Sequence, residues 1–444
     1  MVRPVIFCLV LVGSAVPLMA QKRGAGDDLG REIETRLEQV MPKVIGWRRD
    51  IHQHPELGNR EVRTAKLVAD HLRSLGIEVR TGVAHTGVVG VLKGGKPGPV
   101  VALRADMDAL PVTEQVDLPF KSLARTEYNG QQVGVMHACG HDNHVAILMG
   151  VAEVLAGMKA SIPGTVKFIF QPAEEGPPAG EDGGAPMMVK EGVLENPRPG
   201  AIFGLHVWPG PLGSLDYRPG GAMAAPDGLQ IIVKGRQTHG AAPWGGVDPI
   251  VVASQIVLGL QTIASRQIDV TFNPAIVTIG SIQGGNRGNI IPDSVVMVGT
   301  IRTFDEGQRK DIHMRVRRTA EEIAKASGGT AIVTIPEGGL LTYNDPALTE
   351  KMVPTLRRSA GAGGLRLSQP ITGSEDFPSY TKDIPGLFFF LGVVPKGVDP
   401  LTAPKNHSPL FFADEAALPT GVRALANLAI DYLKMNPIGK TADR

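Results

Sequence analysis

The 444-residue sequence predicts an α/β protein of two domains. Short β-rich runs alternate with helical patterns in the first half, which is typical of a sheet covered by helices on both faces. The expected strands lie at 87–92, 100–103, 166–170, 201–205 and 388–394, and the expected helices at 29–75, 145–158 and 415–433. The second observation is a change of pattern between 219 and 335, which interrupts this series. We therefore expect a mixed sheet with helices on both faces and a smaller domain inserted into it.

The inserted segment, 219–335, has its own order of elements. Strands are expected at 229–233, 276–279 and 295–301, and amphipathic helices at 248–264 and 308–326. The order strand-helix-strand-strand-helix-strand is that of a small α+β sandwich. The larger domain would then consist of 21–218 and 336–444, joined across the insertion.

Composition limits the classes of partner. Apolar residues make up 43% of the chain, enough for a large packed core. The 45 basic and 44 acidic residues leave a net charge of +1, so nothing points to nucleic acid or an anionic membrane. A small-molecule partner is expected instead.

The amino-terminal segment resembles a secretory signal. Arg3 precedes an apolar run at 5–18, and small Ala20 is followed by a polar run beginning at Gln21. This run is short for a spanning helix, so we expect a signal peptide at 1–20 and an exported protein, periplasmic or secreted. The alternative is an uncleaved membrane anchor. No other stretch is long and apolar enough to cross a bilayer, so no stable membrane association is expected after the signal is removed.

Cysteine usage focuses attention on one residue. The chain has two cysteines, Cys8 inside the expected signal and Cys139. A mature chain with one cysteine forms no internal disulfide, so Cys139 is a buried filler, a reactive thiol or a metal ligand. His141 follows two positions later, across a glycine, and both could point into one site from an irregular loop. Thiolate and imidazole are good zinc ligands, although a nucleophilic Cys-His pair is a competing interpretation.

Further groups of metal-ligating type follow the predicted strands. They are Asp106 and Asp108 after 100–103, Glu174 and Glu175 after 166–170, and His206 after 201–205. Polar residues just past the strands of one sheet converge on the crevice where α/β proteins bind ligands. Adjacent glutamates suit a division of labour in which one binds metal and the other moves a proton. Together these residues favour a metal site.

Several motifs occur in a characteristic order: RADMDALP at 104–111, HACGHD at 137–142, QPAEE at 171–175, GLH at 204–206 and NHSP at 406–409. With the segment 47–57, they resemble the metallopeptidase family of aminoacylases, hippurate hydrolases and plant indole-acetyl-amino-acid conjugate hydrolases. The resemblance implies a zinc-peptidase-like catalytic domain with two divalent metal ions, interrupted by a dimerisation domain at 219–335. Zinc, manganese, cobalt and nickel all suit the ligand types.

The resemblance also implies roles for individual residues. The metal ligands would be Cys139, His141, Glu175, His206 and His407. Glu174 would be the general acid and base, and Asp108 would contact a metal ligand rather than a metal ion. Asp106 stands in a position where relatives have a ligand, and the Cys139 thiolate could bridge the two metals.

In the inserted domain the resemblance points to His239 as the group that polarises the scissile carbonyl, and to Asn289 and Arg302 as substrate-binding residues. Ser374 lies in a matching active-site loop at 373–377. A homodimer in which each subunit lends His239 to the other would bring that side chain to the metals. Four further histidines are expected to be structural or to support the ligands: His52, His54, His137 and His144.

The expected reaction is metal-dependent hydrolysis of the amide bond of N-acyl amino acids, of the hippurate or N-acetyl type, releasing a carboxylic acid and a free amino acid. A metallo-dipeptidase or carboxypeptidase is the nearest alternative. A cysteine hydrolase and a non-catalytic exported metal- or solute-binding protein are more distant ones. A proton-transferring Glu174 beside Glu175 argues against simple binding, which needs no second acid.

Overall fold

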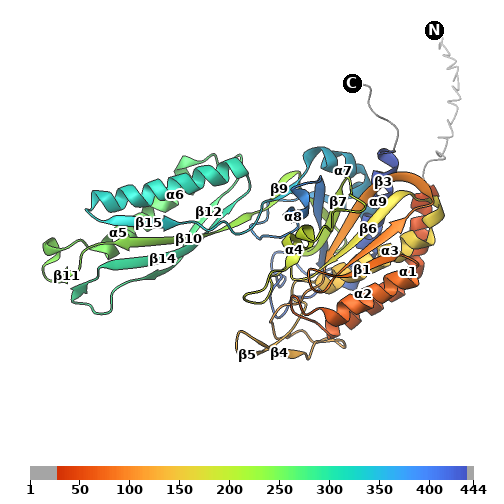
Figure 1. The fold of residues 1–444 in the computed structure, drawn as a ribbon, viewed down its shortest axis with the longest axis horizontal. Coiled ribbons are helices and arrows are strands. Elements are labelled where there is room, and N and C mark those ends of the chain that lie inside the picture. Colours follow the sequence, from red (N-terminus) through yellow and green to blue (C-terminus); the bar gives the residue numbers. More distant parts are fainter. Residues whose placement is uncertain (1–27, 438–444) are drawn as a thin grey trace, which may run out of the picture.

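The computed structural model describes residues 28–437, which form a larger and a smaller lobe lying end to end (Figure 1). The larger lobe is built on an eight-stranded sheet and the smaller on a four-stranded sheet. The expected signal segment, 1–20, lies outside the described residues. Within 28–437, no helix has the length and apolar character needed to cross a membrane.

The sheet of the larger lobe has the order β1-β2-β6-β3-β7-β18-β8-β17. Its strands are β1 (Glu78–Val83), β2 (Gly87–Lys93), β3 (Lys96–Asp106), β6 (Pro163–Gln171), β7 (Ile202–Pro211), β8 (Leu215–Tyr217), β17 (Leu365–Leu367) and β18 (Gly386–Val394). The four central strands, β6, β3, β7 and β18, are parallel, and antiparallel pairs flank them. The predicted mixed sheet is confirmed.

Helices cover both faces of this sheet. The aromatic side chains of β18 are buried on both faces and therefore need a covering layer on each. Phe389 packs in one hydrophobic cluster, whereas Phe388 and Phe390 pack in another, because neighbouring side chains of a strand point to opposite faces. The first face carries α1 (Asp28–Gln53), α2 (Val62–Ser74), α3 (His141–Gly157), α7 (Pro346–Ala360) and α9 (Leu418–Met435). The second carries the short helices α4 (Gly184–Lys190) and α8 (Pro378–Thr381).

The single helical span expected at 29–75 is wrong in one respect, because the structure divides it into α1 and α2. The break contains Pro55, which has no backbone N–H and fixes its φ angle. The carboxylate of Glu56 then accepts hydrogen bonds from the backbone N–H groups of Arg63 (2.9 Å) and Thr64 (2.8 Å), at the start of α2.

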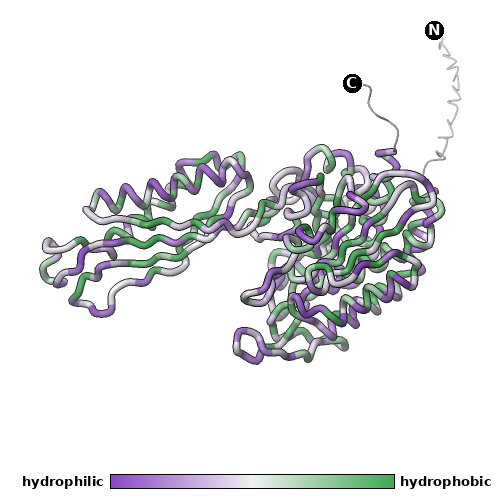
Figure 2. The backbone as a smooth tube through the Cα atoms, viewed as in Figure 1, coloured by the Kyte–Doolittle hydropathy of each residue, from purple (hydrophilic) through white to green (hydrophobic). Residues whose placement is uncertain are grey.

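The smaller lobe is an α+β sandwich with a separate core. Its antiparallel sheet contains β12 (Ile276–Gln283), β14 (Ser294–Thr303), β10 (Ala225–Lys234) and β15 (Thr330–Thr334), in that spatial order. Side chains of β10 pack with those of α5 (Pro249–Thr262) and α6 (Glu306–Ala326) in one cluster. Figure 2 shows the apolar stretches that run along the strands of both lobes.

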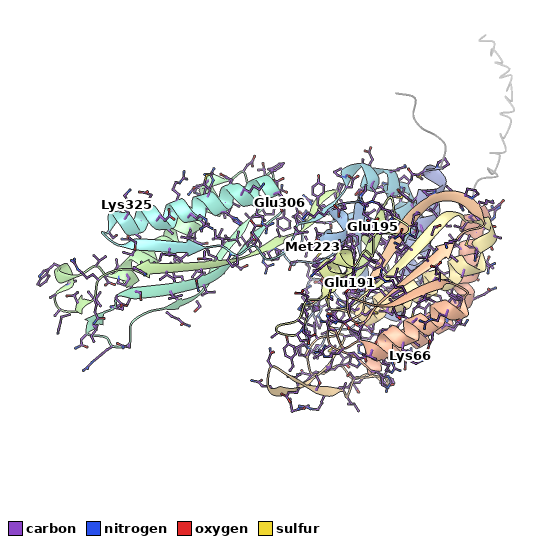
Figure 3. All side chains as sticks on the ribbon, in the orientation of Figure 1. Lys66, Glu191, Glu195, Met223, Glu306 and Lys325 are labelled. Carbon is purple, nitrogen blue, oxygen red and sulfur yellow. The ribbon has the colours of Figure 1, made fainter. Side chains whose placement is uncertain are left out.

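Short paired strands mark the junction and the two tips. At the junction, β9 (Gly220–Met223) pairs with β16 (Thr342–Asn344), and Figure 3 shows Met223 between the lobes. At the far tip of the smaller lobe, β11 (Thr238–His239) pairs with β13 (Ile290–Ile291) (Figure 1). A hairpin of β4 (Arg125–Tyr128) and β5 (Gln131–Gly134) projects from the larger lobe.

Candidate active site and metal centre

The site lies toward the carboxyl ends of the parallel strands, and two strands extend further than predicted. Asp106 is the last residue of β3, and His206 lies inside β7 rather than after it. The backbone of His206 still pairs with Phe390 of β18, so the polar side chain does not end the strand. Sequence patterns locate a strand by its apolar run, whereas the ladder of backbone hydrogen bonds decides where it ends.

The segment around Cys139 is more regular than expected. His141 is not in an irregular loop but is the first residue of α3. Gly140 has a φ of +89°, and a Cβ atom there would lie 2.3 Å from Val207 Cγ2. The glycine therefore permits both the left-handed turn and the close approach to β7, which together bring Cys139 and His141 into one site.

Asp108 fixes the orientation of His141. Its Oδ1 accepts from His141 Nδ1 at 3.2 Å, and its Oδ2 accepts from the backbone N–H of Glu175 at 2.9 Å. The other ring nitrogen, Nε2, is buried without a hydrogen-bond partner and lies 3.8 Å from Glu174 and 4.0 Å from Glu175. A histidine held through one nitrogen, with the other directed at carboxylates, is arranged as a metal ligand.

His206 is held in a comparable way. Its Nδ1 donates to the carbonyl oxygen of Val207 at 2.7 Å, which leaves Nε2 facing the Sγ atom of Cys139 at 3.4 Å. His407 Nε2 lies 3.1 Å from Glu175 Oε1. The backbone N–H of His407 donates to the carbonyl oxygen of Ala138 at 2.8 Å, so the loop bearing His407 is tied to the Cys139 segment.

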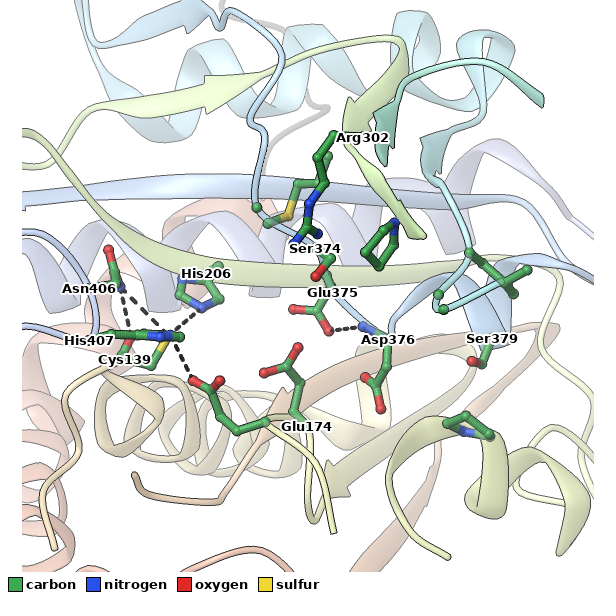
Figure 4. A pocket seen from close by; sticks show the side chains of 18 of the residues that line it. Cys139, Glu174, His206, Arg302, Ser374, Glu375, Asp376, Ser379, Asn406 and His407 are labelled. Atoms are coloured by element: carbon green, nitrogen blue, oxygen red, sulfur yellow. Dashed lines mark hydrogen bonds and ion pairs between the residues drawn. The ribbon is translucent and has the colours of Figure 1, made fainter. Parts of the chain in front are cut away.

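The five predicted ligands form two sets of donors that share Cys139. One set is Cys139, His141 and His206, the other is Cys139, Glu175 and His407, and the donor atoms within each set lie within 4.8 Å of one another. Imidazole, thiolate and carboxylate are suitable ligands for divalent transition metals. The residues present therefore fit two divalent ions, which these five side chains would hold. Figure 4 shows Cys139, His206 and His407 together on one side of the cavity.

Burial and neighbouring carboxylates raise the pKa values of two acidic groups in the cluster, Cys139 and Glu174. Burial raises the pKa of the Cys139 thiol well above its ordinary value, and Glu175 and Glu174 raise it further. Burial likewise raises the pKa of Glu174, with Glu375 and Glu175 adding to the effect. Burial lowers the pKa of His141, but the carboxylates of Asp106 and Asp108 outweigh it and raise that pKa to about 10. Divalent cations would offset this excess of negative charge and displace the protons.

Asp106 is engaged by neighbours other than the ligands. Its Oδ2 forms an ion pair with Arg104 at 2.6 Å, and its Oδ1 accepts from His144 Nδ1. His144 Nε2 in turn accepts from the backbone N–H of Val207 at 2.7 Å. This chain of contacts links the end of β3 to the middle of β7 through the first turn of α3.

Arg104 and Glu375 lie in two of the motifs found in the sequence, 104–111 and 373–377, but the sequence assigns neither of them a role. Arg104 is buried and pairs with Glu375 at 2.7 Å and with Asp376 at 3.1 Å. Glu375 and Glu174 offer oxygens within 4.8 Å of each other and of Asp106, and Figure 4 shows the two glutamates facing one another. Two features of the sequence could have pointed to these residues. Arg104 is a basic residue directly after an apolar strand, and two acidic residues directly follow Ser374.

His239 and the candidate substrate-binding residues separate into two groups. Arg302 and Ser374 line the same cavity of about 770 Å³ as Cys139 and Glu174. His239 and Asn289 do not line it, because they lie at the β11–β13 tip, where the backbone N–H of Gly240 donates to the Asn289 carbonyl at 2.8 Å. Within one chain, the structure thus brings together the metal-ligand candidates but leaves His239 and Asn289 apart from them.

The remaining histidines lie around the site. His52 is buried between Asp142 at 2.9 Å and Glu114 at 3.1 Å. Burial lowers the pKa of His137 to about 3. His54 is exposed, and its Nδ1 donates to the carbonyl of Asp50 at 2.8 Å.

The fold and the donor sets define the class of protein, a metal-dependent amidohydrolase. The sequence profile of peptidase family M20/M25/M40 matches residues 102–431, and the chain belongs to this family.

Relatives and solved structures cover nearly the whole chain. Thermostable carboxypeptidase 1 of Saccharolobus solfataricus is 40% identical, with 91% of this chain and 99% of the relative covered. IAA-amino acid hydrolase ILR1-like 2 of Arabidopsis thaliana is 37% identical, with 91% and 89% covered. The crystal structure of the Bacillus subtilis YXEP protein, a dinuclear metal binding peptidase, is 36% identical. It superimposes with a TM-score of 0.74, covering 89% of this chain and 99% of that one.

Proposed function

We propose that the protein hydrolyses the amide bond of N-acyl amino acids with the help of two divalent metal ions. The observation that carries the proposal is a single cavity lined by four of the five predicted ligands, Cys139, Glu175, His206 and His407. Glu174, which is not one of the five, and Arg302 line the same cavity. Arg302 suits the carboxylate of the amino acid, which every such substrate carries. The similarity to a hydrolase of indole-acetyl amino acids and to a dinuclear metal binding peptidase supports the same reaction.

The residues of the chain divide the work of the reaction. Cys139, His141, Glu175, His206 and His407 would hold the ions. Divalent ions held there would polarise the amide carbonyl and lower the pKa of an attacking water. Glu174 takes a proton from that water as its oxygen bonds to the carbonyl carbon. The proton then passes to the amide nitrogen as the C–N bond breaks, giving a carboxylic acid and a free amino acid.

A carboxypeptidase is the second candidate, because one of the most similar relatives carries that name. The two activities are separated by a panel of substrates with the same carboxyl-terminal residue, bearing N-acetyl, N-benzoyl or aminoacyl groups. We expect N-acyl amino acids to give the highest kcat/KM, and a chelator to abolish turnover until metal is restored. Faster cleavage of dipeptides would favour the peptidase instead. Inhibition by thiol alkylation but not by chelation would favour a cysteine hydrolase.

We further propose that the protein is a homodimer formed through the smaller lobe. The helix α5 contains no charged residue, and Val251 and Leu258 are 52% and 72% exposed on it. The strand β12 is an edge of the four-stranded sheet and exposes Ile282. An apolar helix face beside an open strand edge is suited to pairing with a second copy.

Such a dimer would let His239 act in the active site of the other subunit. Mixing two inactive variants, His239→Ala and Glu174→Gln, should restore activity, because a mixed dimer would contain one site with both groups intact. His239→Ala alone should lose about 3–4 kcal/mol of transition-state stabilisation, the scale of one oxyanion donor. Subunit exchange is verified with differently tagged chains. Proven exchange without recovery would contradict the role in trans.

We also propose that the chain is exported and cleaved after a signal at 1–20. The support is the apolar run at 5–18 followed by the polar run that starts at Gln21. Amino-terminal sequencing of protein from its native host should return a chain that begins near Gln21. A sequence beginning at Met1 or Val2 would refute cleavage.

A further inference from the structure

A second cavity, of about 470 Å³, lies in the larger lobe beside the metal-ligand candidates. It is bounded by the β4–β5 hairpin and by the segments around Leu57 and Leu110. Much of its lining is apolar: Pro55, Leu57, Leu110, Pro111, Ala124 and Val135, with Thr126 and Tyr128 contributed by β4. Its volume is within the range of small-molecule sites.

The second cavity and the first share one lining residue, Glu175, so they lie next to each other. The backbone of Glu175 is fixed by Asp108, and its carboxylate lies 3.1 Å from His407. A substrate whose scissile amide lies beside Glu175 therefore has a cavity on each side. The two arms of the substrate, the acyl group and the amino acid, need different surroundings, because only the amino acid carries a carboxylate.

The first cavity suits the carboxylate arm. It is lined by Arg302 and Lys382, and among residues 28–437 neither has a carboxylate within ion-pair distance. Arg302 Nη1 is buried and has no hydrogen-bond partner. An unpartnered buried guanidinium nitrogen is stabilised by an anionic ligand.

The second cavity lacks a comparable cation. Arg60 on its wall is already paired with Glu181 at 2.6 Å, and the exposed Arg125 and Glu127 carry opposite charges. The carboxylate of Glu56 is used by the hydrogen bonds at the start of α2. An apolar group gains free energy on entering such a cavity, whereas a carboxylate would be desolvated there without a partner.

We propose that the cavity between the β4–β5 hairpin and Leu57 and Leu110 is the subsite for the acyl group, and that it selects bulky apolar acyl groups, aromatic or branched, over acetyl. This inference rests on the proposed hydrolysis of N-acyl amino acids and assigns the acyl side of that site. An acetyl group fills little of the cavity, whereas a benzoyl group can contact Leu110, Ala124 and Tyr128.

The test narrows the cavity with Thr126→Trp and uses Gln132→Trp as a matched control. Gln132 lies on the same hairpin, in the strand paired with β4, but does not line the cavity. With N-benzoyl-L-alanine and N-acetyl-L-alanine as probes, Thr126→Trp should lower kcat/KM for the benzoyl substrate about 10-fold or more relative to the acetyl substrate. Gln132→Trp should leave both values unchanged. Equal losses on both substrates, or no loss on either, would overturn the assignment.

A binding measurement separates this inference from the proposed function. In the Glu174→Gln background, titration calorimetry should show that Thr126→Trp weakens binding of N-benzoyl-L-alanine about 10-fold or more, without a matching loss for N-acetyl-L-alanine. If the unmodified protein hydrolyses neither probe, the proposed function fails, while the calorimetric difference still decides whether the cavity holds the acyl group. Unchanged benzoyl binding would show that it does not.

Discussion

The Glu174→Gln variant is expected to lose turnover by about 100-fold or more while keeping its bound metal. Glutamine has the same shape as glutamate but cannot take a proton from water and pass it to the leaving nitrogen. The position suits that task, because the Glu174 side chain is only 9% exposed and its pKa is raised well above the ordinary value by burial, Glu375 and Glu175. The measurement pairs steady-state kinetics with elemental analysis of the same preparation.

Glu175→Gln is the matched control, since it makes the same chemical change one residue away. Glu175 belongs to a donor set with Cys139 and His407, so its replacement should lower metal content first and activity as a consequence. Added metal should therefore rescue Glu175→Gln in part and leave Glu174→Gln inactive. The reverse pattern would mean that the two glutamates exchange roles.

Cys139→Ala is expected to abolish hydrolysis and to release metal from both positions. The thiol is the donor common to both sets, so its loss removes one ligand from each ion. Loss of an outer hydrogen-bond partner of a metal ligand lowers metal affinity by up to about 100-fold. We expect a larger fall here, because a ligand itself is removed. Titration with a competing chelator measures this directly.

A single cysteine in the described residues makes the result easy to interpret. Cys139→Ser keeps the size of the side chain but replaces sulfur by a poorer ligand, so it should bind metal more weakly than the unmodified protein. Cys139→Ala with full metal content and full activity would remove the thiolate from the site. His54→Ala is a suitable control, because His54 is exposed, follows the end of α1, and bonds to the backbone carbonyl of Asp50.

Local patterns were sufficient to predict the mixed sheet and the separate smaller domain. An apolar run such as that of β18 marks a buried strand wherever its neighbours lie. The positions of Glu174 and Glu175 also followed from a local signal, because they come just after β6. The fold class and the family were thus predictable from short segments and their order.

The network around Arg104 could not be predicted in the same way. Its partner Glu375 is 271 residues away along the chain, and only the pairing of distant segments brings the two together. The length of β7 could not be predicted for the same reason. In the sequence His206 looks like the end of the strand, and only the pairing with β18 shows that the strand continues. Which atoms face one another is set by sheet register and helix contacts, and no short pattern encodes these.

The insertion also sets the order in which the protein can mature during synthesis. His206 is made before the smaller lobe, whereas Glu375 and His407 are made after it. The strand β18, which pairs with β7 in the middle of the sheet, is likewise among the late segments. A nascent chain that ends at the smaller lobe has four of the five predicted ligands but lacks His407, and its Arg104 has no Glu375 to pair with. The catalytic centre is therefore assembled only when the last quarter of the chain has emerged, and the long-range contacts it needs make that final step slow relative to folding of the smaller lobe.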